Sequence, residues 1–148
     1  MAANLEELGR EIKIVQWRQY RALDRRLRGI GTTLPQWDAL RAIANRPGGS
    51  AHELAEATFQ SDQAFGTLAA RLEVKGLIRR SAGHGRRVRH ELTAAGEEIV
   101  SAGREIVVGV FSESFGDLNE TERKRLLRVL RRVGRRLAAL DGGPPPER

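Results

Sequence analysis

The amino-acid sequence predicts a mainly α-helical fold that carries one small β-hairpin. Apolar residues recur at helical spacing through most of the chain, whereas residues 77–92 show the alternation that is typical of strands. The chain has 148 residues, of which 40% are hydrophobic, and this is enough for one domain with a real core. We therefore expect a single mainly α-helical domain with a two-stranded hairpin near its middle.

The first two helices are delimited by glycine, proline and a threonine cap. No proline or glycine interrupts residues 10–28, and the glycines that follow end a helix predicted over about residues 5–30. Thr33 is a suitable N-cap for the second helix, because its side-chain oxygen can accept from a first-turn N–H. Pro35 is tolerated in that turn, and the run of residues 46–49 ends the helix.

Two further helices each begin with a serine. The pattern S-x-x-E at residues 50–53 is a capping box and predicts a short helix to about residue 57. Ser61 can cap a longer helix that runs through Lys75, and Gly76 is well placed as the C′ residue. Helical spacing predicts that the inward face of this helix consists of Phe65, Leu68 and Leu72.

The strand pattern follows directly. Residues 77–80 are strand-like, and residues 81–85 have the composition of a loop. In the second strand, charged residues alternate with Val88, His90 and Leu92. Together these segments predict a small β-hairpin.

Two long helices complete the chain. Thr93 is predicted to cap the fifth helix, and Asn119 or Thr121 opens the last one. The apolar residues of the last helix are spaced 4, 3, 4, 3, which is the a/d seam that usually meets another helix. This seam consists of Leu126, Leu130, Val133, Leu137 and Leu140.

Two short helices followed by a basic hairpin predict a winged helix-turn-helix over about residues 33–92. The second helix of such a pair lies in the major groove and reads base edges, while a basic wing suits phosphate or minor-groove contacts. We expect the side chains of helix 61–75 that are not used in the core to face DNA, together with the wing arginines. The predicted DNA-binding residues are Ser61, Asp62, Gln63, Thr67, Arg71, Arg86, Arg87 and Arg89.

The net charge of +7 is distributed in blocks, and arginine dominates it. Residues 61–92 carry seven basic and three acidic groups, residues 93–118 one and five, and residues 119–141 eight and three. The basic block at residues 61–92 favours DNA binding, because it lies on the predicted winged helix-turn-helix. The basic last helix has an apolar stripe without aromatic residues, so we interpret it as a dimer helix rather than a membrane-surface or RNA-binding arm.

Three segments resemble the MarR family of bacterial transcription regulators. The pattern L-x-x-K-G-L-I-x-R at residues 72–80, with R-x-x-x-x-x-L-T-x-x-G ending at Gly96, is similar to the end of the family's recognition helix and its wing. Residues 34–40 are similar to the opening of its second helix. The chain departs from the family pattern at His84, because the family usually has Asp two residues before the arginine that is kept here as Arg86.

The resemblance implies a homodimer with dimerisation helices at about residues 5–30 and 94–140. Each protomer would contact one half of a pseudo-palindromic site in double-stranded DNA. It also implies a repressor that a small molecule, often an aromatic acid, releases from DNA by binding between the dimer part and the winged part. An arginine beside aromatic rings suits such a ligand, and the candidates are Trp17, Tyr20, Arg21 and Trp37. The alternative is that Trp17 and Trp37 are core residues at this junction.

Several other classes of function have less support. The absence of cysteine excludes disulfide scaffolds, thiolate metal sites and thiol sensors. His52, His84 and His90 are too few and too separated for a zinc site, and no nucleophile motif is present, so we expect neither a cofactor nor an enzyme. The alternative function is a basic dimer that coats DNA or RNA without reading its sequence.

The composition of the chain also predicts its cellular location and the state of its last residues. No apolar run approaches the length of a membrane span, and the N-terminus lacks the apolar stretch of a signal peptide, so we expect a cytoplasmic protein. The glycine- and proline-rich residues 142–148 are expected to be a disordered tail.

Overall fold

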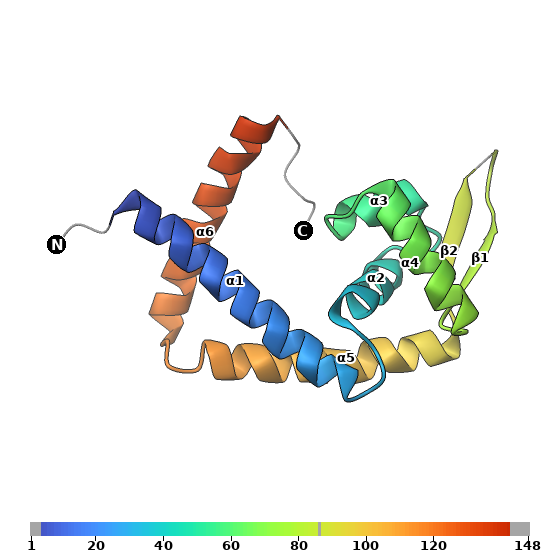
Figure 1. The fold of residues 1–148 in the computed structure, drawn as a ribbon, viewed down its shortest axis with the longest axis horizontal. Coiled ribbons are helices and arrows are strands. Elements are labelled where there is room, and N and C mark those ends of the chain that lie inside the picture. Colours follow the sequence, from blue (N-terminus) through green and yellow to red (C-terminus); the bar gives the residue numbers. More distant parts are fainter. Residues whose placement is uncertain (1–3, 86, 143–148) are drawn as a thin grey trace. The chain divides into compact units, whose positions relative to one another are not determined.

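The computed structural model describes residues 4–85 and 87–142 and confirms the mainly α-helical fold with one antiparallel hairpin (Figure 1). Arg86 and the predicted tail beyond residue 142 lie outside the described residues. The chain divides into two compact units, Met1–Val110 and Phe111–Arg148. In chain order the elements are α1 (Leu5–Arg28), α2 (Leu34–Asn45), α3 (Ala51–Ala57), α4 (Asp62–Val74), β1 (Ile78–Ala82), β2 (Val88–Leu92), α5 (Ala94–Ser114) and α6 (Glu120–Asp141).

The predicted N-caps form. Each cap is a side-chain oxygen that accepts a hydrogen bond from a backbone N–H of the first turn, which would otherwise have no partner. Asn119, rather than Thr121, opens α6 and forms a complete capping box with Glu122. The other capping side chains are Thr33, Ser50, Ser61 and Thr93.

The turn between α4 and β1 is short and fully hydrogen-bonded. Gly76 has a φ of +74°, as its predicted C′ position requires. The Gly76 N–H donates to the Glu73 carbonyl at 2.9 Å, and the Leu77 N–H donates to the Leu72 carbonyl at 3.0 Å, which is the Schellman pattern.

Thr93, at the start of α5, holds this turn in place. Its hydroxyl donates to the Gly76 carbonyl at 2.6 Å, and its N–H donates to the Leu77 carbonyl at 3.0 Å. The start of α5 is therefore tied to the end of α4 by two hydrogen bonds across the turn.

The hydrophobic core of the first unit lies between α2, α3, α4, β1 and the first half of α5. Phe65 and Leu72 are fully buried as predicted, whereas Leu68 is partly buried at the edge of this core. Ala69 is fully buried and was not among the predicted core residues, because its small side chain contributes little to the apolar pattern. The buried cluster consists of Ala39, Leu40, Ala42, Ile43, Leu54, Ala55, Phe65, Ala69, Leu72, Ile78 and Val100.

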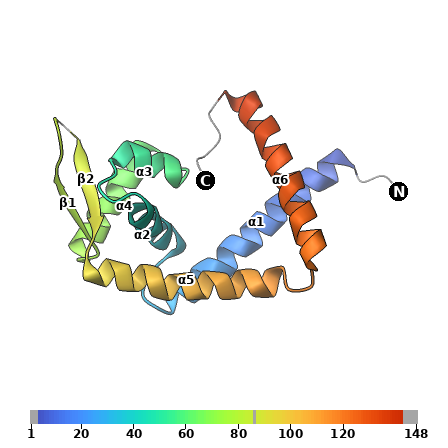
Figure 2. The same cartoon turned by 180° about the vertical axis from the view of Figure 1, so that it is seen from behind.

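The hairpin is longer than the sequence predicted. Ile78 pairs with Leu92, and Ala82 pairs with Val88 at the other end of the ladder. The prediction of a loop over residues 81–85 is wrong at its first two positions, which belong to β1. Their small side chains are typical of loops, but pairing with β2 keeps them extended. Figure 2 shows the hairpin beside α3 and α4.

His90 joins the hairpin to the loop between α2 and α3. Its N–H and its ring Nδ1 both lie within hydrogen-bonding distance of the Gly49 carbonyl, at 3.2 and 2.9 Å. The Gly48 N–H donates to the His90 carbonyl at 2.9 Å. The buried ring also contacts Phe65 edge-on, with centroids 5.8 Å apart. A neutral ring must carry its proton on Nδ1, because a carbonyl only accepts.

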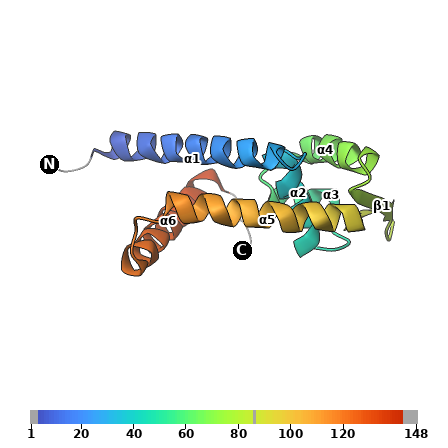
Figure 3. The same cartoon turned by 90° about the horizontal axis from the view of Figure 1, so that it is seen from below.

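The helix α1 is a single continuous helix with two different parts (Figure 3). Near its end, Leu23 and Leu27 are buried within the first unit. The earlier apolar residues occupy an exposed stripe spaced 3, 4, 3, which consists of Leu5, Leu8, Ile12 and Val15. This part of α1 therefore has an apolar face that the single chain leaves uncovered.

The second unit leaves its own apolar face uncovered. None of the α6 residues is buried, although the helix carries the predicted a/d seam. Before it, the rings of Phe111 and Phe115 lie 6.3 Å apart. The seam residues Leu126, Leu130, Val133, Leu137 and Leu140 are all exposed. None of the helices in the described part of the chain combines the length and the hydropathy of a membrane span.

A candidate nucleic-acid interface

The exposed face of α4 carries the predicted reading residues. Gln63, Thr67 and Arg71 are four residues apart, so they lie on one face of the helix, and all three are exposed. The Thr67 hydroxyl donates to the Gln63 carbonyl one turn earlier, at 3.1 Å. Ser61 and Asp62 are exposed at the start of the helix. Val74, at the far end of the helix, is the exposed bulky apolar residue on this face; towards the start of the helix the face carries hydrogen-bonding side chains that can approach a partner closely.

Asp62 is held by a residue that the sequence analysis did not assign to this surface. His52, on α3, places its Nδ1 at 3.0 and 3.1 Å from the two carboxylate oxygens of Asp62. Its Nε2 lies 3.3 Å from the Glu56 carboxylate, one turn along α3. The Asp62 hydrogen bond and charge, assisted by Glu56, raise the pKa of His52 above its ordinary value. The ring therefore keeps its proton to a higher pH than an ordinary histidine does.

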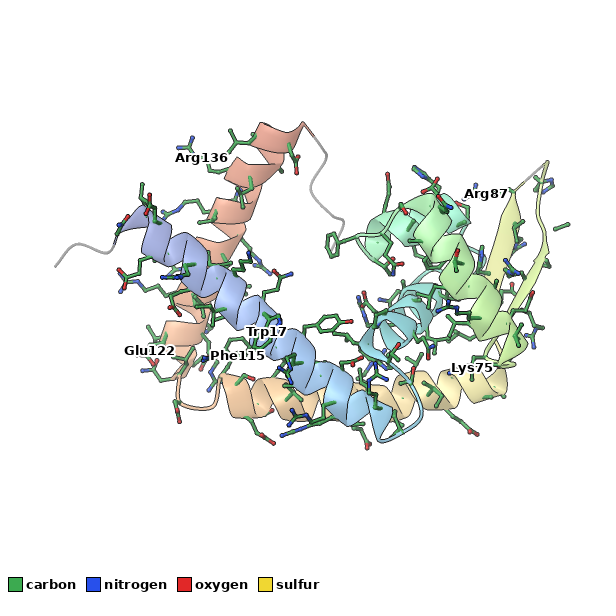
Figure 4. All side chains as sticks on the ribbon, in the orientation of Figure 1. Trp17, Lys75, Arg87, Phe115, Glu122 and Arg136 are labelled. Atoms are coloured by element: carbon green, nitrogen blue, oxygen red, sulfur yellow. The ribbon has the colours of Figure 1, made fainter. Side chains whose placement is uncertain are left out.

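Two of the wing arginines predicted to bind DNA, Arg87 and Arg89, have acidic partners. Arg87 forms an ion pair with Glu53 of α3, which links the wing to the helix-turn-helix. Arg89 lies 3.6 Å from Glu91 on the same strand, and its guanidinium covers Gly48, where an added Cβ would come within 2.7 Å of it. Figure 4 shows Arg87 near the tip of the hairpin, at the end opposite to Lys75.

The base of the wing has a further ion pair. The Arg80 guanidinium donates to Glu73 of α4 at 3.0 Å, and the Arg80 N–H donates to the same carboxylate at 3.1 Å. These contacts lower the pKa of Glu73 below its ordinary value, with the side-chain bond from Arg80 as the largest cause. Lys75 donates to the Gln36 side chain at 3.2 Å. Arg79 and Arg80 thus add exposed basic charge that the sequence analysis did not assign to DNA binding.

The four candidate ligand residues separate into two environments. Trp17, Tyr20 and Arg21 share an exposed face of α1, and the Arg21 guanidinium carbon lies 4.9 Å from the centre of the Trp17 ring. Trp17 is 57% exposed, so it is not part of the core of the single chain (Figure 4).

Trp37, in contrast, is a core residue. It is 5% exposed, and its indole N–H donates to the Val100 carbonyl at 3.3 Å. A Cβ at Gly103 would come within 2.1 Å of its ring nitrogen, so α5 closes directly over the indole. For Trp37, the core interpretation of the sequence therefore agrees with the structure.

A pocket of about 410 Å³ opens elsewhere in the first unit, between the end of α2, β2 and α5. Its lining includes Pro47, Glu91, Leu92, Glu97 and Arg104. It contains none of the four candidate ligand residues. Over residues 4–85 and 87–142, no group of three acidic or histidine side chains is arranged to hold a metal ion.

Comparisons with known proteins identify the family of this chain. A family model described as MarR family matches residues 30–87, which cover the helix-turn-helix and β1 and end just before β2. The chain is 34% identical over 103 residues to the transcriptional regulator HosA of Escherichia coli O127:H6, which covers 68% of this chain and 76% of HosA.

Two other similar proteins have solved structures. The HTH-type transcriptional repressor Rv2887 of Mycobacterium tuberculosis is 29% identical over 107 residues, covering 71% of this chain and 77% of Rv2887. Its complex with salicylic acid superposes with a TM-score of 0.68 at 27% identity, over 90% of this chain and 98% of that one. A mutant of MarR from E. coli in complex with operator DNA superposes with a TM-score of 0.80 at 25% identity, over 88% and 99% of the two chains.

Proposed function

This chain belongs to the MarR family of transcriptional regulators, and from that premise we propose that it represses transcription by binding a specific DNA operator. The observation that carries the proposal is the exposed polar face of α4 beside a basic wing, both fixed on one core. The proposed contacts to bases come from Asp62, Gln63, Thr67 and Arg71. Contacts to phosphates come from Ser61 and the wing arginines Arg86, Arg87 and Arg89.

Selection of DNA tests this proposal. The full-length protein is expected to enrich a pseudo-palindromic sequence from a random library, with half-sites about one helical turn apart. Its affinity for that sequence should fall steeply with salt, because arginines displace counterions from phosphates. Enrichment without any sequence preference would instead favour the architectural dimer that coats nucleic acid.

Variants separate the roles of the two contact sets. Arg87→Ala is expected to weaken binding to all sequences about equally, whereas Gln63→Ala or Thr67→Ala relaxes the preference at particular positions. If both α4 variants kept the wild-type preference, the assignment of Gln63 and Thr67 would be wrong.

The functional unit we propose is a homodimer in the cytoplasm. A single chain contacts one half-site, so a pseudo-palindromic operator requires two copies related by a two-fold axis. The uncovered apolar stripe of α1 and the exposed seam of α6 support this assembly, because large apolar faces on helices are normally covered. We assign dimerisation to about residues 5–30 and 94–140, and DNA binding to about residues 33–92.

A small aromatic acid is the effector class we propose. The stacked pair of Arg21 and Trp17, with Tyr20 on the same face of α1, offers a cation and aromatic surface to such a ligand. The similar repressor Rv2887 has been solved with salicylic acid. Trp37, the fourth candidate residue, is buried, so it would contribute to ligand binding only from within the core. Salicylate is expected to raise the thermal stability of the wild type and to have no effect on Arg21→Gln.

A further inference from the structure

The contact between His52 and Asp62 joins the two helices of the helix-turn-helix, and the function proposed above gives no role to His52. We propose that Asp62 determines specificity by accepting a hydrogen bond from the exocyclic amine of a cytosine in each half-site. His52 is the positioning residue that holds the Asp62 carboxylate for this contact. This inference rests on the proposed function, and the experiment below distinguishes the failure of one from the failure of the other.

The position of Asp62 suits base reading. It is the first residue of α4, and the N-terminal residues of a recognition helix are those that contact base edges. An ionised carboxylate only accepts hydrogen bonds, so its partner must be a donor. In the major groove, cytosine N4 is such a donor, whereas the N6 amine of adenine lies beside the acceptor N7, which would repel the carboxylate. Cytosine is therefore the matching base.

A carboxylate at this place needs a compensating charge. Phosphates line the groove, and an unpaired anion is repelled by them. The His52 ring lies between Asp62 and Glu56, with each ring nitrogen facing one carboxylate. In its cationic form the ring donates to both, which limits the rotamers of Asp62. The remaining lone pairs of the Asp62 carboxylate stay available to accept from a base.

The surroundings of His52 determine how this arrangement responds to pH. Helix α3 packs against α2, α4 and β2. The charged groups that contact the ring are Asp62 from α4 and Glu56 from α3 itself, while the neighbouring Glu53 is occupied by Arg87. Because these carboxylates raise the pKa of His52, the cation is complete below the ordinary pKa of histidine. It is lost as the pH rises through the raised value.

The first test is the base preference of Asp62 variants. Wild-type protein, Asp62→Asn and Asp62→Ala each select DNA from the same random library. We expect one position per half-site where the wild type prefers cytosine and Asp62→Asn prefers adenine, because an asparagine side chain pairs with N6 and N7 of adenine. Asp62→Ala should lose the preference at that position by about tenfold and keep the preferences elsewhere.

The second test is the pH profile of the same preference. The affinity ratio for two operators that differ at this base pair is measured between about pH 5.5 and 8.5, the range in which histidine titrates. For the wild type the ratio should decline with rising pH. His52→Ala should lower it about threefold at acidic pH and flatten the profile. His52→Lys, which keeps a cation and a donor, should restore the ratio across the whole range.

Glu56→Gln is the matched control, because it removes the other carboxylate at the ring and leaves the Asp62 contact in place. It should retain the cytosine preference at acidic pH and lose it at a lower pH than the wild type. Thermal unfolding checks that each variant is folded, which is expected because His52, Glu56 and Asp62 are all exposed.

Two results would overturn the inference while leaving the proposed function intact. One is an unchanged base preference in both Asp62 variants, which would exclude the cytosine contact. The other is a wild-type ratio and pH profile in His52→Ala, which would exclude the positioning role. If the wild-type protein enriched no sequence at all, the proposed function would fail and this inference would fail with it.

Discussion

At the scale of single residues, Asp24 links the end of α1 to the start of α2. Its carboxylate accepts from the Leu34 N–H at 2.8 Å and from the Arg28 guanidinium at 2.8 Å. Both bonds favour the ionised form, so they lower the pKa of Asp24 below its ordinary value, with the Leu34 bond as the largest cause. One side chain therefore satisfies a first-turn N–H of α2 and fixes the approach of α1.

Asp24→Asn is expected to lower the free energy of unfolding by about 1–2 kcal/mol at neutral pH. The stabilisation by the wild-type carboxylate is complete above its unfolded pKa near 3.9 and is lost as the pH falls through the lowered folded value. The variant should therefore lose less stability in acid than the wild type does. Urea unfolding across this range measures the effect.

Asp38→Asn provides the comparison for Asp24→Asn, because the Asp38 ion pair with Arg41 lies within one helix and joins no second element. In acid, Asp38→Asn should change the pH dependence of the free energy of unfolding less than Asp24→Asn does. If the free energy of unfolding of Asp24→Asn changed with pH as it does in the wild type, the Asp24 carboxylate would not contribute to stability.

Gly96 has no room for a side chain. A Cβ there would lie 2.1 Å from the Leu77 carbonyl oxygen, which is part of the backbone and cannot move away. Gly96→Ala is expected to lower the free energy of unfolding by about 2–3 kcal/mol. Gly109→Ala, on the same helix with nothing within 4 Å of its Cβ, should be neutral or stabilise by up to about 1 kcal/mol. Equal unfolding midpoints in urea would contradict this difference.

The sequence predicts single residues well where one helix determines their neighbours. Gln63, Thr67 and Arg71 share an exposed face because helical spacing places them there. The contacts of His52 with Asp62 and of Glu53 with Arg87 could not be predicted in this way. They join different elements, so they depend on how the helices and the hairpin pack.

At the scale of elements, the wing is tied to the rest of the first unit at several points. Glu53 contacts Arg87 near the tip, Glu73 contacts Arg80 at the base, and Gly49 accepts from His90 along β2. Each tie comes from a different element, so the hairpin orientation depends on α3, α4 and the loop before α3. The contact of Glu53 also supplies a partner for a wing arginine although His84 stands where the related wing pattern has Asp.

Glu53→Gln is expected to loosen the tip of the wing. An exposed ion pair contributes little, so amide hydrogen exchange at Val88 and Arg89 should accelerate about two- to fivefold, while exchange in α4 stays unchanged. Glu91→Gln is the control, because the Glu91 pair with Arg89 lies within a single strand. Equal acceleration in the two variants would show that the link to α3 does not restrain the wing.

Element boundaries were predictable where a capping side chain marks them. Thr33, Ser50, Ser61 and Asn119 open their helices at the predicted places because the cap is a local interaction. The end of β1 was not predictable from the sequence, because its last residues are extended only through pairing with β2. The attachment of residues 48–49 to β2 was also missed, since it joins segments about forty residues apart.

At the scale of the whole molecule, charge and apolar surface have different roles. The basic groups of residues 61–92 surround the candidate reading surface, whereas those of α6 share a helix with an exposed apolar seam. In the proposed dimer, a second copy binds at that seam. We therefore assign the proposed dimer contacts to α6 and α1, and the proposed DNA contacts to α4 and the wing.

Leu130→Glu is expected to break the proposed dimer, because it places a charge at the centre of the α6 seam. The dissociation constant of the dimer should rise by about two orders of magnitude. Sedimentation without DNA measures it. Val74→Glu is the matched control, since Val74 is 89% exposed on α4 and belongs to no seam. Equal sedimentation of Leu130→Glu and wild type would exclude the seam as the interface.

The tie between Thr93 and the turn after α4 has a consequence for how the sequence can evolve. Only three residues separate α4 from β1, and the carbonyls of Gly76 and Leu77 are both taken by Thr93. A one-residue insertion or deletion in this turn would disrupt both bonds, and if β1 slid by one residue along β2 to restore them, each of its side chains would turn to the opposite face. Length variation among relatives is therefore expected beyond the end of β1 at Ala82, because added residues there leave the turn after α4 unchanged.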